Sequence, residues 1–326
     1  MIGRASRIFP VVAALSLAAL MAAPAAYAAD SAQDMLAAGR ADEAIAALNT
    51  RLASTPADAE SLNLLCRAYY ELEDWDRAAA SCKKAASLDP GNSRFHVWLG
   101  CAYGEKAERE NFLAAIVLAV KVREEFERAV QLDANNVEAR LDLAEFYVEA
   151  PAFLGGGEQK ARAQAQSIGA LDPGREHWVY ANIAEKKKDA ATAEREYHQY
   201  IDLSEGDAEA WLNLSLFLRR QKRLDEMEQA IVKLSQAPMP KLEVLVEASG
   251  NLHRAGRNFP LATELLRRYF AAGPVEAAPA FRARYLLGTL LEKQGDKAGA
   301  AQEYRAAFSL AHSFRDAQQA LDRVTH

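Results

Sequence analysis

A pattern of 34 residues recurs along the chain, and it constrains the fold more than any other feature of the sequence. Residues 59–92 and residues 281–314 are two copies of equal length. In the first copy, Leu62, Leu65 and Tyr69 recur at the spacing of one helix face. A short polar turn follows, and then a second amphipathic helix. Because one helix pair cannot bury its apolar faces alone, we expect neighbouring pairs to stack around a shared core.

The pattern resembles the tetratricopeptide repeat, in which W-x2-L-G-x2-Y precedes a second helix with small, aromatic and small residues and a closing proline. The matching positions are Leu62, Leu65, Cys66, Tyr69, Ala78, Cys82, Ala85 and Pro90 in one copy and Leu287, Gly288, Gly295, Ala300, Tyr304 and Ala307 in the other. The resemblance implies an all-α fold, a right-handed superhelical solenoid of about eight helix pairs over residues 29–326. Residues 314–324 would form a C-terminal capping helix.

One copy of the repeat is about ten residues too long, which predicts an insertion near residues 107–120. It contains the apolar run NFLAAIVLAV, and we expect an extended helical hairpin there. Two readings of this run stay open. In the first reading, the run packs against the lengthened first helix through Leu113, Ile116, Val117 and Val120. In the second, the run forms an exposed apolar patch, with Leu113 and Ile116 at its centre, for a partner or a second copy.

A second insertion, near residues 150–157, contains three consecutive glycines. It lacks the preceding strand and the G-x-x-x-x-G-K-S/T spacing that a phosphate loop needs. Pro151 ends the preceding helix and the glycines allow the backbone to reverse, so we predict an enlarged turn. Phe153 and Leu154 of this turn are candidates for an apolar patch over the groove or against a partner.

The first residues have the three parts of a secretory signal peptide. Two arginines precede an apolar core, and Ala26-Tyr27-Ala28 fits the small-x-small cleavage rule. We therefore expect residues 1–28 to be removed after Ala28 and the product to be periplasmic or secreted, with no stable membrane span. An uncleaved anchor is the alternative, but the apolar run is short for a bilayer.

Charge and motif content argue against most other functions. The formal net charge of −6 makes the chain a poor nucleic-acid binder, because phosphate contacts need a basic surface. There is no H-E-x-x-H, C-x-x-C or G-x-S-x-G motif, and the six histidines do not cluster. The repeats leave no room for a separate catalytic domain. We predict no catalytic residues, no metal and no cofactor, and so no enzyme.

The chain has three cysteines. Cys66 and Cys82 occupy facing positions on the two helices of one repeat, where a disulfide would suit an oxidising compartment. Two small buried hydrophobic side chains are the other reading. Cys101 lies one position past the packing stripe, so it could face the groove.

The resemblance also implies a concave groove lined mainly by the first helices of the pairs. The stripe next to each buried stripe supplies the candidate lining, which includes Leu141, Glu145, Leu212 and Glu247. Amides and guanidinium groups suit a peptide backbone, and aromatic rings supply anchors. The predicted partner-binding residues are Asn63, Arg67, Tyr70, Arg94, Trp98, Trp178, Asn182, Asn213, Arg219 and Asn251. An ordinary solvated surface is the alternative.

These observations favour a non-enzymatic interaction module in the bacterial periplasm. As a scaffold or adaptor, it would bind a protein or peptide of unknown identity in the groove. The alternative is a self-associating structural scaffold in cell-envelope assembly or export, a homo-oligomer that would use the apolar insertion.

Overall fold

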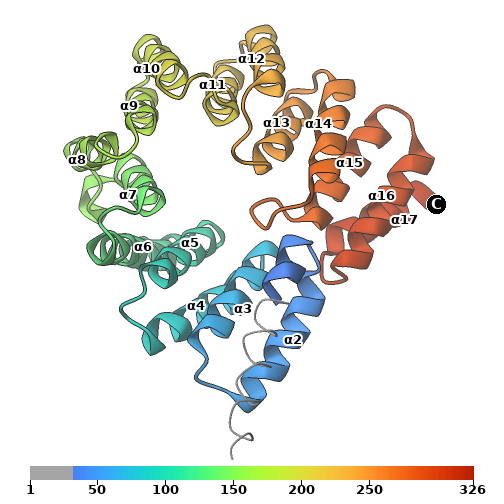
Figure 1. Ribbon diagram of the computed structural model, residues 1–326, viewed down its shortest axis with the longest axis horizontal. Coiled ribbons are helices and arrows are strands. Elements are labelled where there is room, and N and C mark those ends of the chain that lie inside the picture. The colour runs from blue at the N-terminus through green and yellow to red at the C-terminus, as the bar shows by residue number, and fades with distance from the viewer. Residues whose placement is uncertain (1–31) are drawn as a thin grey trace, which may run out of the picture.

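The computed structural model describes residues 32–326, which form an all-helical solenoid without strands (Figure 1). The predicted signal peptide lies outside the described residues. After a short helical stretch at residues 32–37, the helices are α2 (Ala41–Ser54), α3 (Ala59–Glu71), α4 (Trp75–Leu88), α5 (Ser93–Arg109), α6 (Phe112–Leu132), α7 (Val137–Glu149), the 3-10 helix Ala152–Leu154, α8 (Glu158–Gly169), α9 (Pro173–Lys186), α10 (Ala190–Leu203), α11 (Ala208–Arg220), α12 (Leu224–Gln236), α13 (Glu243–Ala255), α14 (Phe259–Ala272), α15 (Ala280–Lys293), α16 (Lys297–Leu310) and α17 (Arg315–Thr325). The predicted all-α solenoid fold is confirmed.

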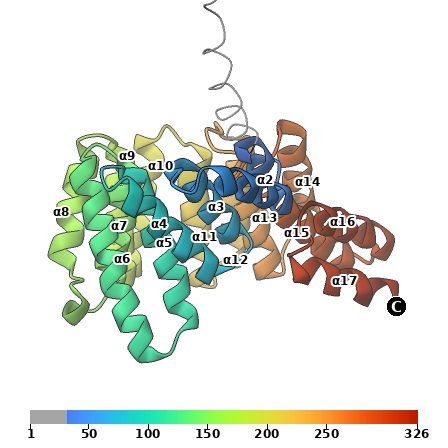
Figure 2. The same ribbon diagram turned by 90° about the horizontal axis from the view of Figure 1, so that it is seen from below.

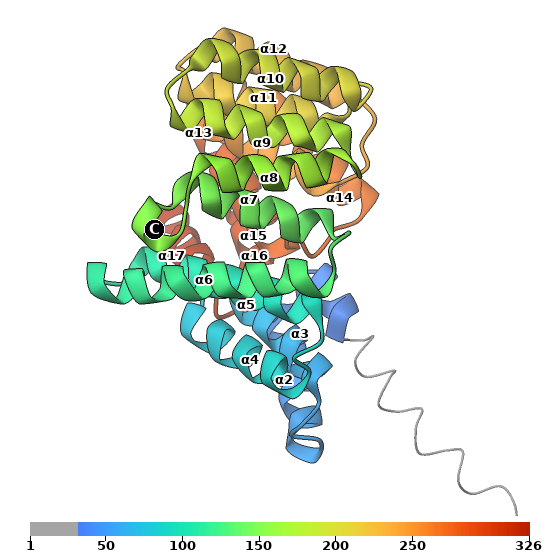
Figure 3. The ribbon, with the colours of Figure 1, turned by 90° about the vertical axis from the view of Figure 1, so that its left-hand side faces the viewer.

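Consecutive helices form hairpins, from α3 with α4 to α15 with α16, and α17 packs on α16 as a cap. In Figure 1 the helices α3, α5, α7, α9, α11 and α13 face the inside of the curve, and their partners lie outside. Side views show the hairpins stacked side by side (Figures 2 and 3). The first helices of successive pairs therefore share one inner face.

Several turns within the hairpins share the same backbone conformation and hydrogen bonds. In several of these turns a residue two or three positions before the second helix has a left-handed φ, as at Glu73 (56°), Lys188 (60°) and Gly256 (65°). The next residue then donates its backbone N–H back to the first helix, as Asp74 does to the Tyr69 carbonyl at 2.9 Å. The Asp74 side chain also accepts the N–H of the third residue on and so caps the second helix. Polar residues at these turns thus end one helix and begin the next.

The glycine of the repeat pattern allows two helices to approach closely. A Cβ added to Gly100 would lie 2.4 Å from a ring carbon of Phe126, and one added to Gly288 would lie 2.6 Å from the ring of Tyr304. These contacts place the aromatic ring of each second helix against the first helix. The glycine slot is therefore a packing position, filled by the partner ring.

The first insertion is an extended hairpin, formed by α5 with 17 residues and α6 with 21 residues. Its tip projects beyond the neighbouring repeats (Figures 2 and 3). The internal-packing reading is wrong for Leu113 and Val117, which are 74% and 55% exposed. The buried face lies later on α6, where Leu118, Val122 and Phe126 follow one another at helical spacing. Leu113 and Val117 stay exposed because the tip extends past the neighbouring repeats.

The three glycines form an enlarged turn between α7 and α8. Gly155 and Gly157 have left-handed φ values of 93° and 148°, and a Cβ on Gly156 would lie 1.8 Å from the Ala150 carbonyl oxygen. Arg123 of α6 donates a hydrogen bond to the Leu154 carbonyl oxygen at 2.9 Å. The turn is therefore fixed to the preceding repeat, and it leaves Phe153 71% exposed.

The two ends of the solenoid meet, so the molecule is a closed ring (Figure 1). Ala41 of α2 is fully buried in one cluster with Phe281 and Ala311. Beside this cluster, the Asp42 carboxylate accepts a 2.7 Å hydrogen bond from the Ser313 hydroxyl. Gly39 comes so near α15 that a Cβ there would lie 2.7 Å from the Ala280 nitrogen. The repeat period predicted a superhelix but not this closure.

Candidate functional site

A cavity of about 270 Å³ lies on the inner face of the ring. Four successive first helices, α7, α9, α11 and α13, contribute to it. We call it the inner-face cavity, and its central lining residues are Leu141, Asp142, Glu145, Arg175, Trp178, Glu209, Leu212, Asn213, Lys241 and Glu247. It matches the predicted position of a groove lined by first helices.

Two of the predicted partner-binding residues meet in this cavity. The Trp178 indole N–H donates to the Asn213 side-chain oxygen at 2.9 Å. The Asn213 amide nitrogen in turn donates to the Glu209 backbone carbonyl at 2.8 Å. The amide is thereby oriented, with one N–H and one oxygen lone pair left for other groups. The half-buried Leu141 supplies apolar surface beside it, and the buried Leu212 lies behind the cavity wall.

Carboxylates outnumber basic groups in the inner-face cavity. Arg175 donates to Glu138 at 2.6 Å and to Glu209 at 2.9 Å, and Lys241 lies 3.2 Å from both. These two cations are therefore already occupied. Within residues 32–326, the other carboxylates of the cavity have no ion-pair partner; they are Asp142, Glu145, Glu243 and Glu247.

Asp142, Glu145 and Glu247 have raised pKa values. Burial, together with the charges of Glu145 and Glu138, raises the pKa of Asp142 to about 7. Burial and the nearby Glu149 raise the pKa of Glu145, and burial and Glu243 raise that of Glu247. The inner face thus holds acidic groups that its own cations do not neutralise.

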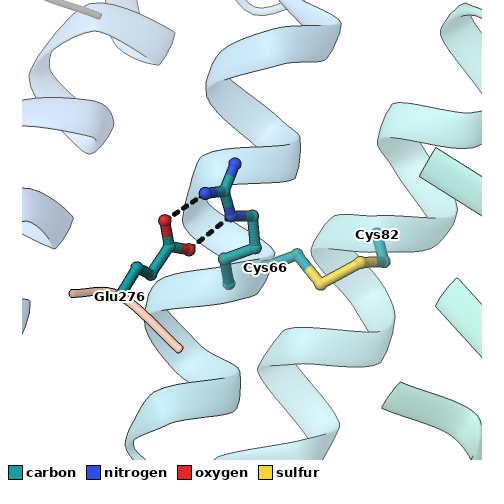
Figure 4. Close-up of a disulfide and its surroundings, with 4 residues drawn as sticks. Cys66, Cys82 and Glu276 are labelled. Carbon is teal, nitrogen blue, oxygen red and sulfur yellow. Dashed lines mark hydrogen bonds and ion pairs between the residues drawn. A yellow bond between two sulfur atoms is a disulfide. The ribbon is translucent and has the colours of Figure 1, made fainter. Parts of the chain in front are cut away.

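Three more predicted residues line a second cavity, of about 520 Å³, where the ends of the ring meet. They are Arg67, Tyr70 and Trp98. We call this the closure cavity. The Arg67 guanidinium donates two hydrogen bonds to the carboxylate of Glu276, which lies on the connection between α14 and α15. Figure 4 shows Glu276 beside the disulfide of the α3–α4 hairpin.

The remaining predicted residues do not line either cavity. The prediction that Asn63 and Asn251 contact a partner is wrong. Both side chains are fully buried inside the protein. Asn251 instead donates to the Ser215 hydroxyl at 3.0 Å and accepts from Arg219. Two other side chains also bond within the chain: Asn182 donates to the Trp178 carbonyl, and Arg94 pairs with Glu60.

Cys66 and Cys82 form a disulfide between α3 and α4, with a Cα–Cα distance of 5.2 Å (Figure 4). Both residues are fully buried. The disulfide therefore fixes the helix that carries the adjacent Arg67. Cys101 is unpaired, and burial together with Asp142 and Glu105 raises the pKa of its thiol, so that it stays protonated.

Residues 32–326 contain no cluster of His, Cys, Asp or Glu side chains arranged to hold a metal ion. In the same range, no helix combines the length and the apolar character that a membrane crossing requires.

Sequence reasoning missed the residues that close the ring. Glu276 meets Arg67 across 209 residues, and Arg282 of α15 donates to the Glu71 carbonyl across 211 residues. Neither contact follows from the repeat period. The one local signal is the connection at residues 273–279, which is longer than the other connections between described hairpins and holds two prolines.

Solved structures with similar folds are repeat proteins of low sequence identity. Yeast Tom70 matches with a TM-score of 0.52 and 16% identity, over 87% of this chain and 58% of that one. A thermophilic tetratricopeptide repeat protein from Thermus thermophilus matches with a TM-score of 0.48 and 18% identity, over 60% of this chain and 98% of that one. These likenesses concern the fold alone. No curated protein matches the chain in sequence.

Family-level comparison identifies the repeat directly. Tetratricopeptide repeat profiles match residues 35–96, 181–232 and 248–313, which together make up more than half of the chain. The matched ranges include the hairpins α3–α4 and α15–α16, where the sequence pattern is clearest. This fold supports a role in protein–protein interaction. The chain belongs to the tetratricopeptide repeat family.

Proposed function

We propose that the protein is a non-enzymatic scaffold of the bacterial periplasm, which holds an extended segment of a partner protein against the inner face of its ring. The observation that carries the proposal is the inner-face cavity itself. Four consecutive repeats contribute to it, so an extended chain lying across them would contact each repeat in turn.

The lining chemistry suits a peptide with basic side chains. Trp178 and Leu141 offer apolar surface for an anchoring side chain, and the oriented amide of Asn213 can bond a peptide backbone. The unpaired carboxylates, Glu145 and Glu247 among them, would attract lysine or arginine and disfavour acidic segments. Binding of this kind rests on several modest contacts and needs no chemical step.

The periplasmic location is part of the same proposal. The signal-like sequence at residues 1–28 supports export. The buried disulfide between Cys66 and Cys82 fits an oxidising compartment, where such bonds form and persist. Detection of the protein in a periplasmic fraction, with a mass that corresponds to cleavage after Ala28, would test this part directly.

Site-specific photo-crosslinking tests the groove. A photoreactive residue at the half-buried Leu141 in the inner-face cavity should capture a partner, whereas one at Val232 on the outer helix α12, 39% exposed, should not. Trp178→Ala and Asn213→Ala should each lower the crosslink yield about tenfold without loss of helix content. Equal capture from Leu141 and Val232 would reject the inner face as the binding surface.

Self-association is a second candidate, and a specific observation favours it. Phe112 and Leu113, each 74% exposed, and Val117 form an apolar surface on the projecting tip of α6. Light scattering at rising concentration separates the two functions. Under the self-association proposal, wild-type protein dimerises and Leu113→Asp is monomeric; a wild-type monomer throughout would exclude this role.

A further inference from the structure

The closure cavity has an aromatic wall that the proposed function does not use. Tyr70 lies edge-to-face against both Trp75 and Trp98, with ring centroids 5.0 Å and 5.5 Å away. All three line the cavity of about 520 Å³, a volume within the range of small-ligand sites. Arg67 already lies over the ring of Trp98, so this wall accepts a cation in the molecule as it stands.

Glu71 lines the same cavity and lacks a partner. Glu71 is only 7% exposed. Within residues 32–326, neither of its carboxylate oxygens accepts a hydrogen bond. Buried polar groups without partners are rare and costly, which points to a further group at this site.

The basic residues around the cavity are engaged elsewhere. Arg67 is bound to Glu276. Arg282 donates to the backbone carbonyl of Glu71 and to the carboxylate of Glu73, and Arg109 also pairs with Glu73. None of these guanidinium groups neutralises the Glu71 carboxylate by a direct contact. Glu105, on the other side of Tyr70, accepts only from the Tyr70 hydroxyl at 3.3 Å within the described chain.

We propose that the closure cavity is a binding site for an organic cation, in which an ammonium or guanidinium group on a flexible chain lies against Tyr70 and Trp75 and pairs with Glu71. Aromatic faces attract such cations, and the carboxylate supplies both acceptors and countercharge. An anion would meet unpaired carboxylates instead. The cation could be a lysine or arginine of a partner or a free diamine. The site is separate from the inner-face cavity.

The state of Glu71 links binding to pH. Burial and the charge of Glu276 raise the pKa of Glu71 well above its usual value, although Arg67 and Arg282 oppose the shift. The other charged groups facing it across the cavity are Glu73, Glu105 and Arg109. A bound cation favours the ionised carboxylate, so binding should release a proton and tighten as pH rises, by at most about tenfold per pH unit.

Calorimetric titration of the purified protein tests the site with defined probes. The probes are 1,5-diaminopentane, the capped tripeptide acetyl-Gly-Lys-Gly-amide and its neutral counterpart with glutamine. We expect saturable binding of at least one cationic probe, none of the neutral one, and an enthalpy that depends on buffer because a proton is released. Glu71→Gln should weaken binding at least tenfold and remove the buffer dependence. The matched exposed control, Glu124→Gln on α6, should change neither.

The outcomes distinguish the source of the cation. Binding of the peptide alone assigns a partner side chain, and binding of the diamine alone assigns a free amine. If Glu71→Gln loses helix content, Trp75→Phe replaces it, since this change keeps the ring but removes the indole N–H and part of the attraction for a cation. The proposal is overturned if no cationic probe saturates by 10 mM, or if a folded Glu71 or Trp75 variant binds like wild type. Either result leaves the inner-face function untouched.

Discussion

Arg67 and Glu276 are 209 residues apart in sequence, yet their side chains form a two-point ion pair that is only 9% and 17% exposed. The pair connects an early repeat to the connection before the last hairpin (Figure 4). In an open solenoid each repeat contacts only its neighbours. Here a contact between distant repeats adds to the neighbour contacts, so the two ends of the ring should unfold together.

Glu276→Gln should open or loosen the ring. It leaves Arg67 without its countercharge in a largely buried position, which costs about 3 kcal/mol. Small-angle X-ray scattering should show a larger maximum dimension, while circular dichroism keeps the same helix content. Glu60→Gln, which removes the exposed ion pair with Arg94, should cost less than about 1 kcal/mol and leave the scattering profile unchanged. A wild-type profile for Glu276→Gln would contradict this prediction.

The disulfide should stabilise the repeat that carries Arg67. Cys66 and Cys82 are 16 residues apart, and a loop of that size contributes about 3 kcal/mol through the unfolded chain. Urea unfolding should therefore show a loss of about 2 to 3 kcal/mol for Cys82→Ala. Wild-type protein in reductant should show a similar loss, whereas Cys101→Ser should respond to reductant as wild type does. If reductant left the urea midpoint of the wild-type protein unchanged, the stabilising role of the disulfide would be refuted.

The glycine slots of the repeat should resist even a methyl group. Gly100→Ala would force a Cβ against Phe126 and should cost about 1 to 3 kcal/mol in the free energy of unfolding. Gly250→Ala is the matched control within a helix, because its nearest neighbour, the Arg254 guanidinium, is 3.5 Å away. This control should gain about 0.5 to 1 kcal/mol from helix propensity. Thermal unfolding of both variants measures these changes. Equal shifts in melting temperature for Gly100→Ala and Gly250→Ala would contradict the packing argument.

The acidic inner face should make stability depend on pH. Asp142 has a pKa of about 7 in the folded protein and an ordinary value near 4 when unfolded. The folded state therefore holds more protons between those values, and the free energy of unfolding falls as pH rises from about 4 to 7. Since the open cavity admits water that screens the charge, we expect a fall of about 1 to 2 kcal/mol from this residue.

Asp142→Asn should remove the part of the pH-dependent loss of unfolding free energy that comes from this carboxyl group. Urea unfolding at pH 5 and pH 8 measures it: the variant should be more stable than wild type at pH 8, and the two should be closer at pH 5. Asp202→Asn, on an exposed position of α10, should follow the wild-type pH profile. A variant at Asp142 with the wild-type pH profile would refute the assignment.

The local parts of the fold could be read from the sequence because the repeat code is local. Leu62, Tyr69 and Gly100 occupy slots defined by helical spacing, and their neighbours follow from it. The same spacing indicated that Trp178 and Leu212 would share the inner face. It failed for Asn251, because an offset of one position cannot tell a groove from the seam between two helices. It left two readings open for Leu113, because its burial depends on how far the adjacent repeats reach.

Ring closure sets a limit that open solenoids do not have. An open stack tolerates gain or loss of a hairpin, since each new unit needs only a neighbour. In this protein, one hairpin more or fewer between α3 and α15 would displace Phe281 from Ala41 and Glu276 from Arg67, and the ends would no longer meet. The count of hairpins is therefore fixed by geometry, and a duplication or deletion of a whole unit would disrupt the seam even where every individual unit folds well.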